Sequence, residues 1–326
     1  MSFRNFIELA AETGDLVTVD QAVDTRFELA NVAHALEGRL VLFEAVTEHP
    51  GWRVCSGLCA DRRFFAMDLG VPLNGLMHHL AQALEHPVTP PLIDKAPCQE
   101  VVIEDVDLFD LPIPLHLPQD AGHYIASNVV IIKDPDLGRN MCYHRLLRLD
   151  KNHFAARIVE RRGTATALQK SGGELEVAIC IGVSQAVHLA ASMSPPPGVD
   201  ELSVAHALAS TPLVKCLSKD LEVPAEAEIV LEGRITRRRT AEGPFMDLTE
   251  TMDIVRDQPV IEIDLITHRR KPIFHALLPG GLEHKMLMGM PREPTIYAEV
   301  NRVAKCTGAA ITPGGASWLH AVVQID

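Results

Sequence analysis

The sequence lacks the features of a membrane protein, a secreted disulfide-rich protein or a nucleic-acid binder. Its longest apolar run, Val177–Val183, is far shorter than the roughly 20 residues that cross a bilayer. Its start has no signal-peptide core, and its seven cysteines are an odd number scattered along the chain, so we expect reduced thiols in the cytoplasm. Acidic residues outnumber basic ones by 43 to 30, which argues against the basic face that DNA or RNA binding requires.

What the sequence does contain is enough apolar material for a large globular protein. Hydrophobic residues make up 47% of the chain and charged residues 22%, a balance that fills a core and excludes wholesale disorder. A length of 326 residues suits two packed domains, or one large domain with a cap. The net charge of −13 still allows a local basic pocket for one phosphate or carboxylate.

The first ninety residues alternate helix and strand signals, which predicts a small α/β layer. Capping residues, glycine stops and apolar spacing mark the elements. In order, they are a helix that Ser2 caps and Gly14 ends, a strand at Leu16–Val19, a helix from Asp24 to Gly38, a strand at Leu40–Phe43, and a helix that Asn74 caps and that carries Leu76, Leu80 and Leu84.

A cluster of prolines then predicts an irregular linker without a regular element and a domain boundary at residue 97. The prolines are Pro87, Pro90, Pro91 and Pro97.

Beyond the linker, segments rich in Val and Ile predict a β-rich domain. The predicted strands are 129–132, 177–183, 228–235, 260–266 and 321–325. The alternation of apolar and polar residues in 260–266 indicates an antiparallel sheet or barrel with one wet face. A late helix is predicted from Ile296, Val300 and Val303, with Gly308 at its end.

Three motifs carry residues that could do chemistry, and each also has an ordinary structural reading. The segment 140–145 (NMCYHR), followed by 150–153 (DKNH), could be a polar turn whose arginine forms a surface ion pair. The segment 242–247 (EGPFMD) could be an acidic turn, or could bring two acids to one cavity beside an arginine fork. The Pro-rich loop from Ser192 ends at Glu201, which could complement a helix dipole, or could join Asn and His as a ligand of Mn²⁺ or Mg²⁺.

Together and in this order, the three motifs resemble the UbiD family, decarboxylases that use prenylated FMN. Four more segments also resemble the family. Segment 3–24 resembles its opening helix and strand, 105–114 and 120–125 resemble the stretch leading into its cofactor domain, and 213–233 is similar to a later part. The resemblance covers essentially the whole chain.

The resemblance implies an α+β fold: a small N-terminal α/β domain, residues 1–97, followed by a split β-barrel domain, residues 98–326, that binds prenylated FMN. It implies that Asn140, His153 and Glu201 coordinate Mn²⁺ or Mg²⁺ next to the cofactor phosphate, with K⁺ as a further ion. The residues implied to line the cofactor are Asn140, Met141, Cys142, Tyr143, His144, Arg145, Asn152, His153, Ser192, Met193 and Glu201.

The family's network of one arginine and two acids would be Arg145, Glu242 and Asp247 in this chain. By that resemblance, Arg145 would hold the substrate carboxylate or keep the acids in register, Asp247 would protonate the carbon after CO₂ leaves, and Glu242 would tune the network and support the flavin. Met288 matches a position that lines the substrate pocket in relatives. The chain departs from the family at Met246, usually Gly, and at His144, usually Tyr, and we expect these changes to reshape the pocket.

Relatives continue past the strand at 321–325, which we expect to close the barrel, into a C-terminal domain that builds the oligomer. We therefore expect a homo-oligomer, or a partner subunit that supplies those parts. The first functional hypothesis is a reversible non-oxidative decarboxylase of a small aromatic or α,β-unsaturated carboxylic acid. The second is a non-catalytic or partner-dependent flavin-binding subunit, and the third is a flavin reductase built on a related barrel.

Overall fold

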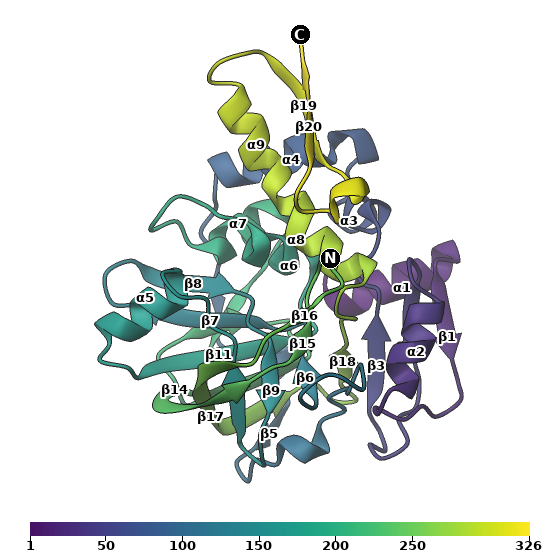
Figure 1. Cartoon of the computed structure of the whole chain (residues 1–326), viewed down its shortest axis with the longest axis vertical. Helices are drawn as coiled ribbons and strands as arrows, with labels where there is room; N and C mark the ends of the chain where they lie inside the picture. The colour runs from purple at the N-terminus through teal and green to yellow at the C-terminus, as the bar shows by residue number, and fades with distance from the viewer.

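The computed structural model describes residues 1–326 and shows a small α/β unit beside a large curved sheet (Figure 1). This confirms the predicted fold class. The small unit holds one four-stranded sheet, ordered β1 (Leu16–Val19), β2 (Leu40–Phe43), β3 (Arg53–Ser56) and β18 (Ile273–His275). The strands β1 and β2 have the predicted bounds, whereas β18 comes from late in the chain and pairs in parallel with β3.

Local capping explains the first helix, α1 (Phe3–Thr13), as predicted. The Ser2 hydroxyl accepts a hydrogen bond from the Asn5 backbone N–H at 3.2 Å, and Gly14 ends the helix in the left-handed conformation, with φ 78°. The helix α2 (Glu28–Ala35) begins later than Asp24, because the Asp24 carboxylate accepts from the Arg26 N–H and forms a turn first.

Two further helices complete this part of the chain. The helix α4 (Leu76–Glu85) carries the predicted apolar stripe, but no side chain caps it, because Asn74 lies inside the 3₁₀ turn Leu73–Gly75. The sequence patterns did not predict α3 (Arg62–Leu69), which Asp61 caps through the Arg63 N–H.

The large sheet has nine strands, and its path runs β6–β9–β10–β17–β14–β11–β7–β8, with β5 paired to β17. All these neighbours are antiparallel. The strands are β5 (Val101–Ile103), β6 (Tyr124–Ile125), β7 (Val129–Asp134), β8 (Gly138–Cys142), β9 (Leu146–Arg148), β10 (His153–Ala156), β11 (Leu175–Ile181), β14 (Ile229–Glu242) and β17 (Arg256–His268).

The two faces of this sheet pack into different cores. Side chains such as Ile132 and Ile261 fill the inside of the curve, whereas Ile131 and Ala178 face outward to a second core. The helices that contribute to the outward core are α1, α3, α4, α6 (Gln185–Ser192), α7 (Glu201–Leu208) and α8 (Leu282–Gly289), while α5 (Gly163–Lys170) packs on β7.

The proline-rich linker contains one short strand, contrary to the prediction that it has no regular element. Strand β4 (Leu92–Ile93) pairs in parallel with β12 (Leu213–Lys215), which in turn pairs with β13 (Glu222–Pro224). The prolines flank this two-residue strand and interrupt none of its pairs, and the Pro91 carbonyl accepts from the Leu213 N–H at 2.9 Å. The predicted boundary at residue 97 falls between β4 and β5.

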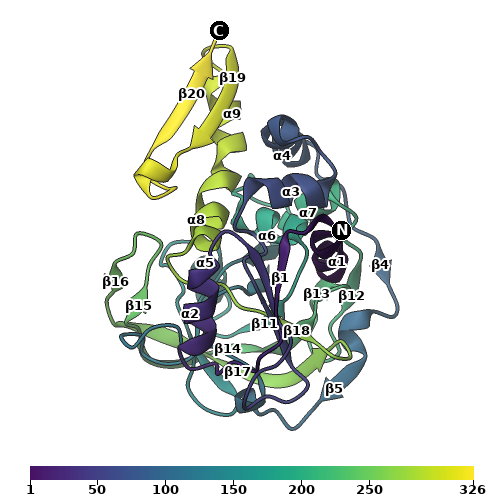
Figure 2. The same ribbon diagram turned by 90° about the vertical axis from the view of Figure 1, so that its right-hand side faces the viewer.

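The C-terminal part differs most from the prediction. Strand β20 (Ala321–Ile325) does not close the barrel, because it pairs only with β19 (Cys306–Ile311) in a hairpin that projects from the body (Figures 1 and 2). The late helix α9 (Glu293–Val300) ends before Val303, and Gly308 lies in β19. The Asn301 side chain accepts from the Cys306 N–H and directs the chain into the hairpin. No helix in the structure is long and apolar enough to span a membrane.

We expect Gly233→Ala to destabilise the protein, because the backbone of β17 leaves no room for a side chain at this glycine of β14. A Cβ atom at residue 233 would lie 2.0 Å from the Glu262 carbonyl oxygen, next to a register shift in the pairing. The backbone must move, at a cost of about 1–3 kcal/mol in the free energy of unfolding measured in urea. Gly308→Ala is the matched control, since its nearest neighbour would be 3.6 Å away. Equal stability of the two variants would contradict this reading.

Candidate active site

Most of the predicted catalytic residues border one cavity of about 200 Å³. Five of the predicted site residues, Tyr143, Arg145, Ser192, Asp247 and Met288, lie in its wall. The other lining residues are Ala126, Arg157, Val159, Phe245, Met246, Leu277, Pro279, His284 and Leu287. The wall therefore combines apolar side chains with two guanidinium groups, one carboxylate and one imidazole.

Arg145 is held in this wall by a buried carboxylate. Its Nε and Nη2 donate to the two oxygens of Glu242 at 2.8 and 2.9 Å, and Glu242 has no exposed surface. The Tyr124 hydroxyl donates to the same carboxylate at 3.1 Å and accepts from the Gly243 N–H. Burial lowers the pKa of Arg145, but the hydrogen bonds and charges of its acidic partners outweigh it and leave that pKa raised. The guanidinium is therefore always charged.

The second acid on Arg145 is Asp253, in the hairpin formed by β15 (Phe245–Met246) and β16 (Met252–Asp253). Arg145 Nη2 donates to Asp253 at 2.9 Å, and Arg256 pairs with the other carboxylate oxygen at 2.5 Å. Burial opposes ionisation of Asp253, yet the bonds from Arg256 and Arg145 lower its pKa. Sequence analysis missed Asp253 because it lies outside the motif that ends at residue 247.

Asp247 lines the same cavity as Arg145, and no hydrogen bond or ion pair joins the two side chains. Its carboxylate accepts from the Leu248 N–H at 2.7 Å, and its backbone closes a tight turn with Glu250 and Thr251. The arginine and the predicted proton donor share a wall without pairing.

His284 is a second cavity residue that the sequence motifs did not indicate. It lies in α8, and its Nδ1 accepts from the Gly280 N–H at 3.1 Å. Burial lowers the pKa of His284 to about 4, although the charge of Asp247 opposes this shift. The ring is therefore neutral near pH 7 and carries its proton on Nε2. The sequence feature that could have indicated this residue is the pair Gly280–Gly281, which lets the chain turn into α8 just before His284.

Two of the three predicted metal ligands meet beside β8. The Asn140 Nδ2 donates to one oxygen of Glu201 at 2.8 Å, and the Met141 N–H donates to the other at 2.8 Å. Glu201 stands in the first turn of α7 and is 7% exposed, and this burial raises its pKa to about 7. Amide and carboxylate oxygens are the hard donors that Mn²⁺ and Mg²⁺ prefer.

The structure does not bring His153 to this pair, which corrects the expectation of a three-residue set. His153 opens β10, where its Nδ1 contacts Asp150 at 2.8 Å and its backbone faces Glu262 of β17. The next residue, Phe154, points into the inner core, so His153 points to the opposite face of the sheet. Asn152 belongs to the same turn, and its carbonyl accepts from the Ile263 N–H.

The remaining predicted cofactor-lining residues lie behind the cavity wall. Met141 and Met193 are part of the outward core. Cys142 and His144 contact Thr164 of α5, the latter through Nε2 at 2.9 Å, and burial lowers the pKa of His144 to about 4. None of these four side chains borders the cavity.

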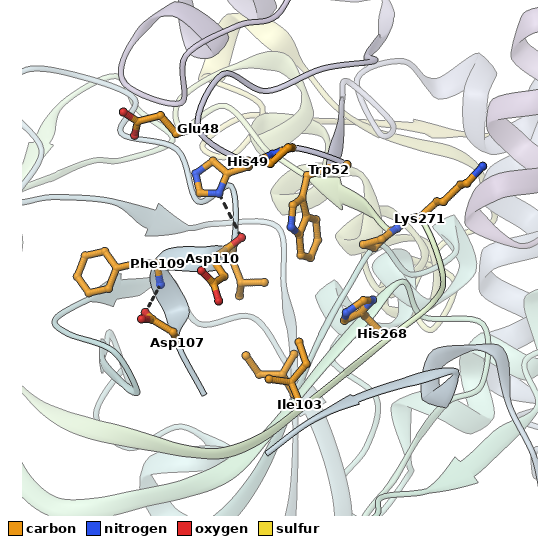
Figure 3. Close-up of a pocket in the computed structure, with 14 residues that line it drawn as sticks. Glu48, His49, Trp52, Ile103, Asp107, Phe109, Asp110, His268 and Lys271 are labelled. Atoms are coloured by element: carbon orange, nitrogen blue, oxygen red, sulfur yellow. Dashed lines mark hydrogen bonds between the residues drawn. The ribbon is translucent and has the colours of Figure 1, made fainter. Parts of the chain in front are cut away.

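Another cavity, of about 530 Å³, lies elsewhere and contains none of the predicted site residues (Figure 3). It is bordered by Trp52, His268 and Lys271, and by Asp110, whose carbonyl is 3.1 Å from the His49 ring. Its aspartates and histidines form no group of three that could hold a metal ion. The smaller cavity at Arg145 therefore remains the candidate active site.

Comparison with known families accounts for most of the chain. Residues 7–84 match the family described as 3-octaprenyl-4-hydroxybenzoate carboxy-lyase N-terminal domain. Residues 92–282 match the Rift-related domain of the same carboxy-lyase.

Individual proteins are similar over nearly the whole chain. The anhydromevalonate phosphate decarboxylase of Methanothermobacter thermautotrophicus is 39% identical over 330 residues, which cover 99% of this chain and 76% of that protein. The UbiD-class enzyme HmfF from Pelotomaculum thermopropionicum, an evolved dimeric form in complex with prFMN, has a TM-score of 0.96 at 37% identity, covering 99% of this chain and 78% of that one. The 3,4-dihydroxybenzoic acid decarboxylase of Klebsiella pneumoniae has a TM-score of 0.92 at 25% identity, covering 100% and 75%.

The raised pKa of Glu201 predicts how stability depends on pH. Folded Glu201 keeps its proton up to pH 7, whereas the unfolded residue loses it near 4.5, so stability falls as pH rises between these values. We expect the free energy of unfolding of the metal-free protein to fall by about 2 kcal/mol more than that of Glu201→Gln between pH 5 and pH 8. Exposed Glu48→Gln is the control. The same pH dependence in wild type and Glu201→Gln would contradict this assignment.

Proposed function

The chain belongs to the UbiD family of carboxy-lyases, and we propose that it decarboxylates a small aromatic or α,β-unsaturated carboxylic acid with prenylated FMN as its cofactor. The observation that carries this proposal is the cavity in which Arg145, held by Glu242 and Asp253, shares a wall with Asp247. The prFMN complex of HmfF, similar over 99% of this chain, supports the choice of cofactor.

The residues around the cavity fit a flavin. Apolar side chains such as Leu277, Leu287 and Phe245 suit a flat ring, and Arg145 and Arg157 suit anionic groups. Tyr143 and Ser192 add hydroxyl groups to the same wall. When bound, prenylated FMN would supply an electron sink for the electron pair that remains on carbon after CO₂ leaves.

Asn140 and Glu201 fit one side of a divalent cation site. A cation there would take the place of the proton that buried Glu201 otherwise prefers. We assign Mn²⁺ or Mg²⁺ to this pair from its oxygen donors, with K⁺ as a further ion nearby. His153 is not assigned to the ion, because it lies with Asp150.

Arg145 binds the substrate carboxylate in this mechanism. Its Nε and Nη2 are engaged by Glu242 and Asp253, so Nη1 is the nitrogen left to donate to a ligand. The two acids keep the guanidinium in one orientation and balance its charge. The substrate therefore meets a preoriented donor with no need for rearrangement.

Asp247 delivers a proton to the carbon that loses CO₂. It lines the same cavity as Arg145, and no ion pair joins the two residues. Neutral His284, which lines the same cavity, presents an N–H group and no positive charge at pH 7.

The names of the relatives favour two kinds of substrate. The archaeal relative is named for anhydromevalonate phosphate, and a structural neighbour for 3,4-dihydroxybenzoic acid. The proposal therefore includes a phosphorylated unsaturated acid and an aromatic acid. A partner-dependent flavin-binding subunit is the second candidate, favoured by the projecting hairpin with exposed Leu319, Val322 and Ile325. A homo-oligomer would cover the same hairpin.

The experiment is to coexpress the chain with a flavin prenyltransferase, supply Mn²⁺, and record the absorption spectrum and the mass of the released cofactor. We expect prenylated FMN and CO₂ release from at least one acid of a panel containing both substrate kinds. If the chain binds flavin but releases CO₂ only when a copurifying polypeptide is added, the result would favour the partner-dependent subunit. NADH oxidation without decarboxylation would instead select a flavin reductase.

Arg145→Ala and Glu242→Gln should lose activity while keeping the fold. Arg145→Ala removes the guanidinium that would bind the substrate carboxylate, and Glu242→Gln removes one of the two carboxylates that orient this guanidinium. Either change misplaces the substrate carboxylate, so we expect kcat/KM to fall by about 100-fold or more. Circular dichroism and bound flavin monitor folding. Arg234→Ala, which removes a surface ion pair with Glu262 in the same sheet, is the matched control. Normal turnover in either variant would refute the assigned roles.

Asp247→Asn should separate proton delivery from binding. Asparagine keeps the shape but has no acidic proton, so kcat should fall by about 10²–10⁴-fold with KM changed little. Asp257→Asn, at an acid paired with Arg239 on the surface, serves as control. A rise in KM with unchanged kcat would show that Asp247 binds substrate and donates no proton.

A further inference from the structure

A second arginine, Arg157, borders the candidate active-site cavity, and the mechanism above gives it no step. It follows directly after β10, and its backbone N–H donates to the Arg145 carbonyl at 3.1 Å. This bond continues the pairing of β10 with β9, in which Ala156 lies opposite Leu146. Arg157 is therefore the residue directly opposite Arg145.

The two arginine side chains point to the same face of the sheet. Leu146 and Ala156, their neighbours in the chain, both belong to the inner core. Because successive residues of a strand point to opposite faces, Arg145 and Arg157 face away from that core, and both line the cavity. Directly opposed residues have Cβ atoms about 4.5–5.5 Å apart, so the two guanidinium groups start side by side.

The protein balances the charge of these arginines unequally. Arg145 is engaged by the carboxylates of Glu242 and Asp253. The side chain of Arg157 is only 16% exposed, yet its carboxylate partner Glu160 is 3.6 Å away and 71% exposed. Water screens such a pair, so it stabilises the charge little. The hydrogen bond of the Arg157 side chain goes from Nη1 to the Ile158 carbonyl, at 3.0 Å.

The cavity therefore contains a positive charge that the surrounding residues do not neutralise. Asp247 is the one carboxylate in the wall, and no ion pair joins it to Arg157. Like charges on directly opposed residues destabilise a sheet, and proteins accept such local costs mainly at functional sites. An arginine pair of this kind becomes favourable when anionic groups occupy the space in front of it.

The position of Arg157 favours the substrate over the cofactor phosphate as the source of that anion. The phosphate is expected beside the cation site at Asn140 and Glu201, and neither of these residues borders the cavity. Asp247, the proposed proton donor, does border it. Arg157 thus faces the space in which the reacting acid would lie.

On the basis of the proposed function, we propose that Arg157 determines specificity for a second anionic group, and that the substrate is a small unsaturated or aromatic carboxylic acid with a further carboxylate or phosphate. Arg145 binds the carboxylate that leaves as CO₂, and Arg157 binds the anionic group that remains. The planar guanidinium fork can donate to two oxygens of either group. A phosphorylated unsaturated acid, as in the name of the archaeal relative, belongs to this class.

Binding of matched acids tests this proposal without any turnover. Terephthalate and 4-methylbenzoate differ by one carboxylate in place of a methyl group, and so do fumarate and crotonate. In calorimetric titrations of the full-length protein loaded with FMN, we expect the dianion of each pair to bind about tenfold more tightly or better. Equal affinity for both members of each pair would overturn the proposal.

Variants of Arg157 assign the preference to this side chain. We expect Arg157→Gln to abolish it, and Arg157→Lys, which keeps the charge without the fork, to retain part of it. Arg234→Gln removes one positive charge from a surface ion pair and should keep the full preference. If Arg157→Gln weakens both acids of a pair equally, its role is structural and the proposal is wrong. Thermal unfolding of each variant identifies misfolding.

A titration with flavins separates the substrate from the cofactor phosphate. If Arg157→Gln weakens binding of FMN but not of riboflavin, which has no phosphate, the guanidinium binds the cofactor and the proposal is overturned. We expect Arg157→Gln to leave the affinities of both flavins unchanged.

Failure of the proposed function would be recognised separately. If the protein loaded with prenylated FMN releases CO₂ from no acid, the proposed function fails, while the titrations still decide whether Arg157 selects dianions. If the protein binds no FMN, the same titrations are made on the flavin-free protein. In an active enzyme, Arg157→Gln should raise KM for dianionic acids by about tenfold with kcat nearly unchanged.

Discussion

The site depends on one constraint, the cost of placing a permanent positive charge at Arg145 among buried groups. Taking a guanidinium out of water is unfavourable unless carboxylates accept its hydrogen bonds, and Glu242 and Asp253 do so from two different strands. The long β14–β17 pair brings these acids to one place, because Glu242 ends β14 and Asp253 lies just before β17 begins. The strand pairing and the charge pairing therefore stabilise the same geometry.

The same principle explains other buried acids in a chain with a net charge of −13. Glu228 has no exposed surface, and it accepts from Arg4 of α1 at 2.6 and 2.7 Å and from the Ile273 N–H. Arg62 of α3 pairs in the same way with buried Glu293 at the start of α9. Each pair joins segments far apart in the sequence, so removing one partner would leave a buried charge uncompensated.

Sequence patterns correctly predicted the elements that depend mainly on neighbouring residues in the chain. Ser2 and Gly14 define α1 by themselves, and the alternation in 260–266 predicted β17 with Glu262 and Asp264 on its polar side. Sequence patterns failed for residues whose place in the site depends on a contact with a distant segment. Asp253 belongs to the site only because β15 and β16 fold back onto Arg145. His153, which the family resemblance implied as a ligand, is turned by its strand toward Asp150.

The position of β18 also bears on how the chain is made. Its three residues complete the sheet that begins with β1, yet they follow the whole of the large sheet in the sequence. Until residue 275 has left the ribosome, a nascent chain contains only three strands of that first sheet. The edge of β3 that later pairs with β18 is unpaired during this time. The sheet of the N-terminal unit therefore cannot be completed before the last strand of the large sheet has been synthesised, and a fragment ending at residue 97 would expose a strand edge prone to association.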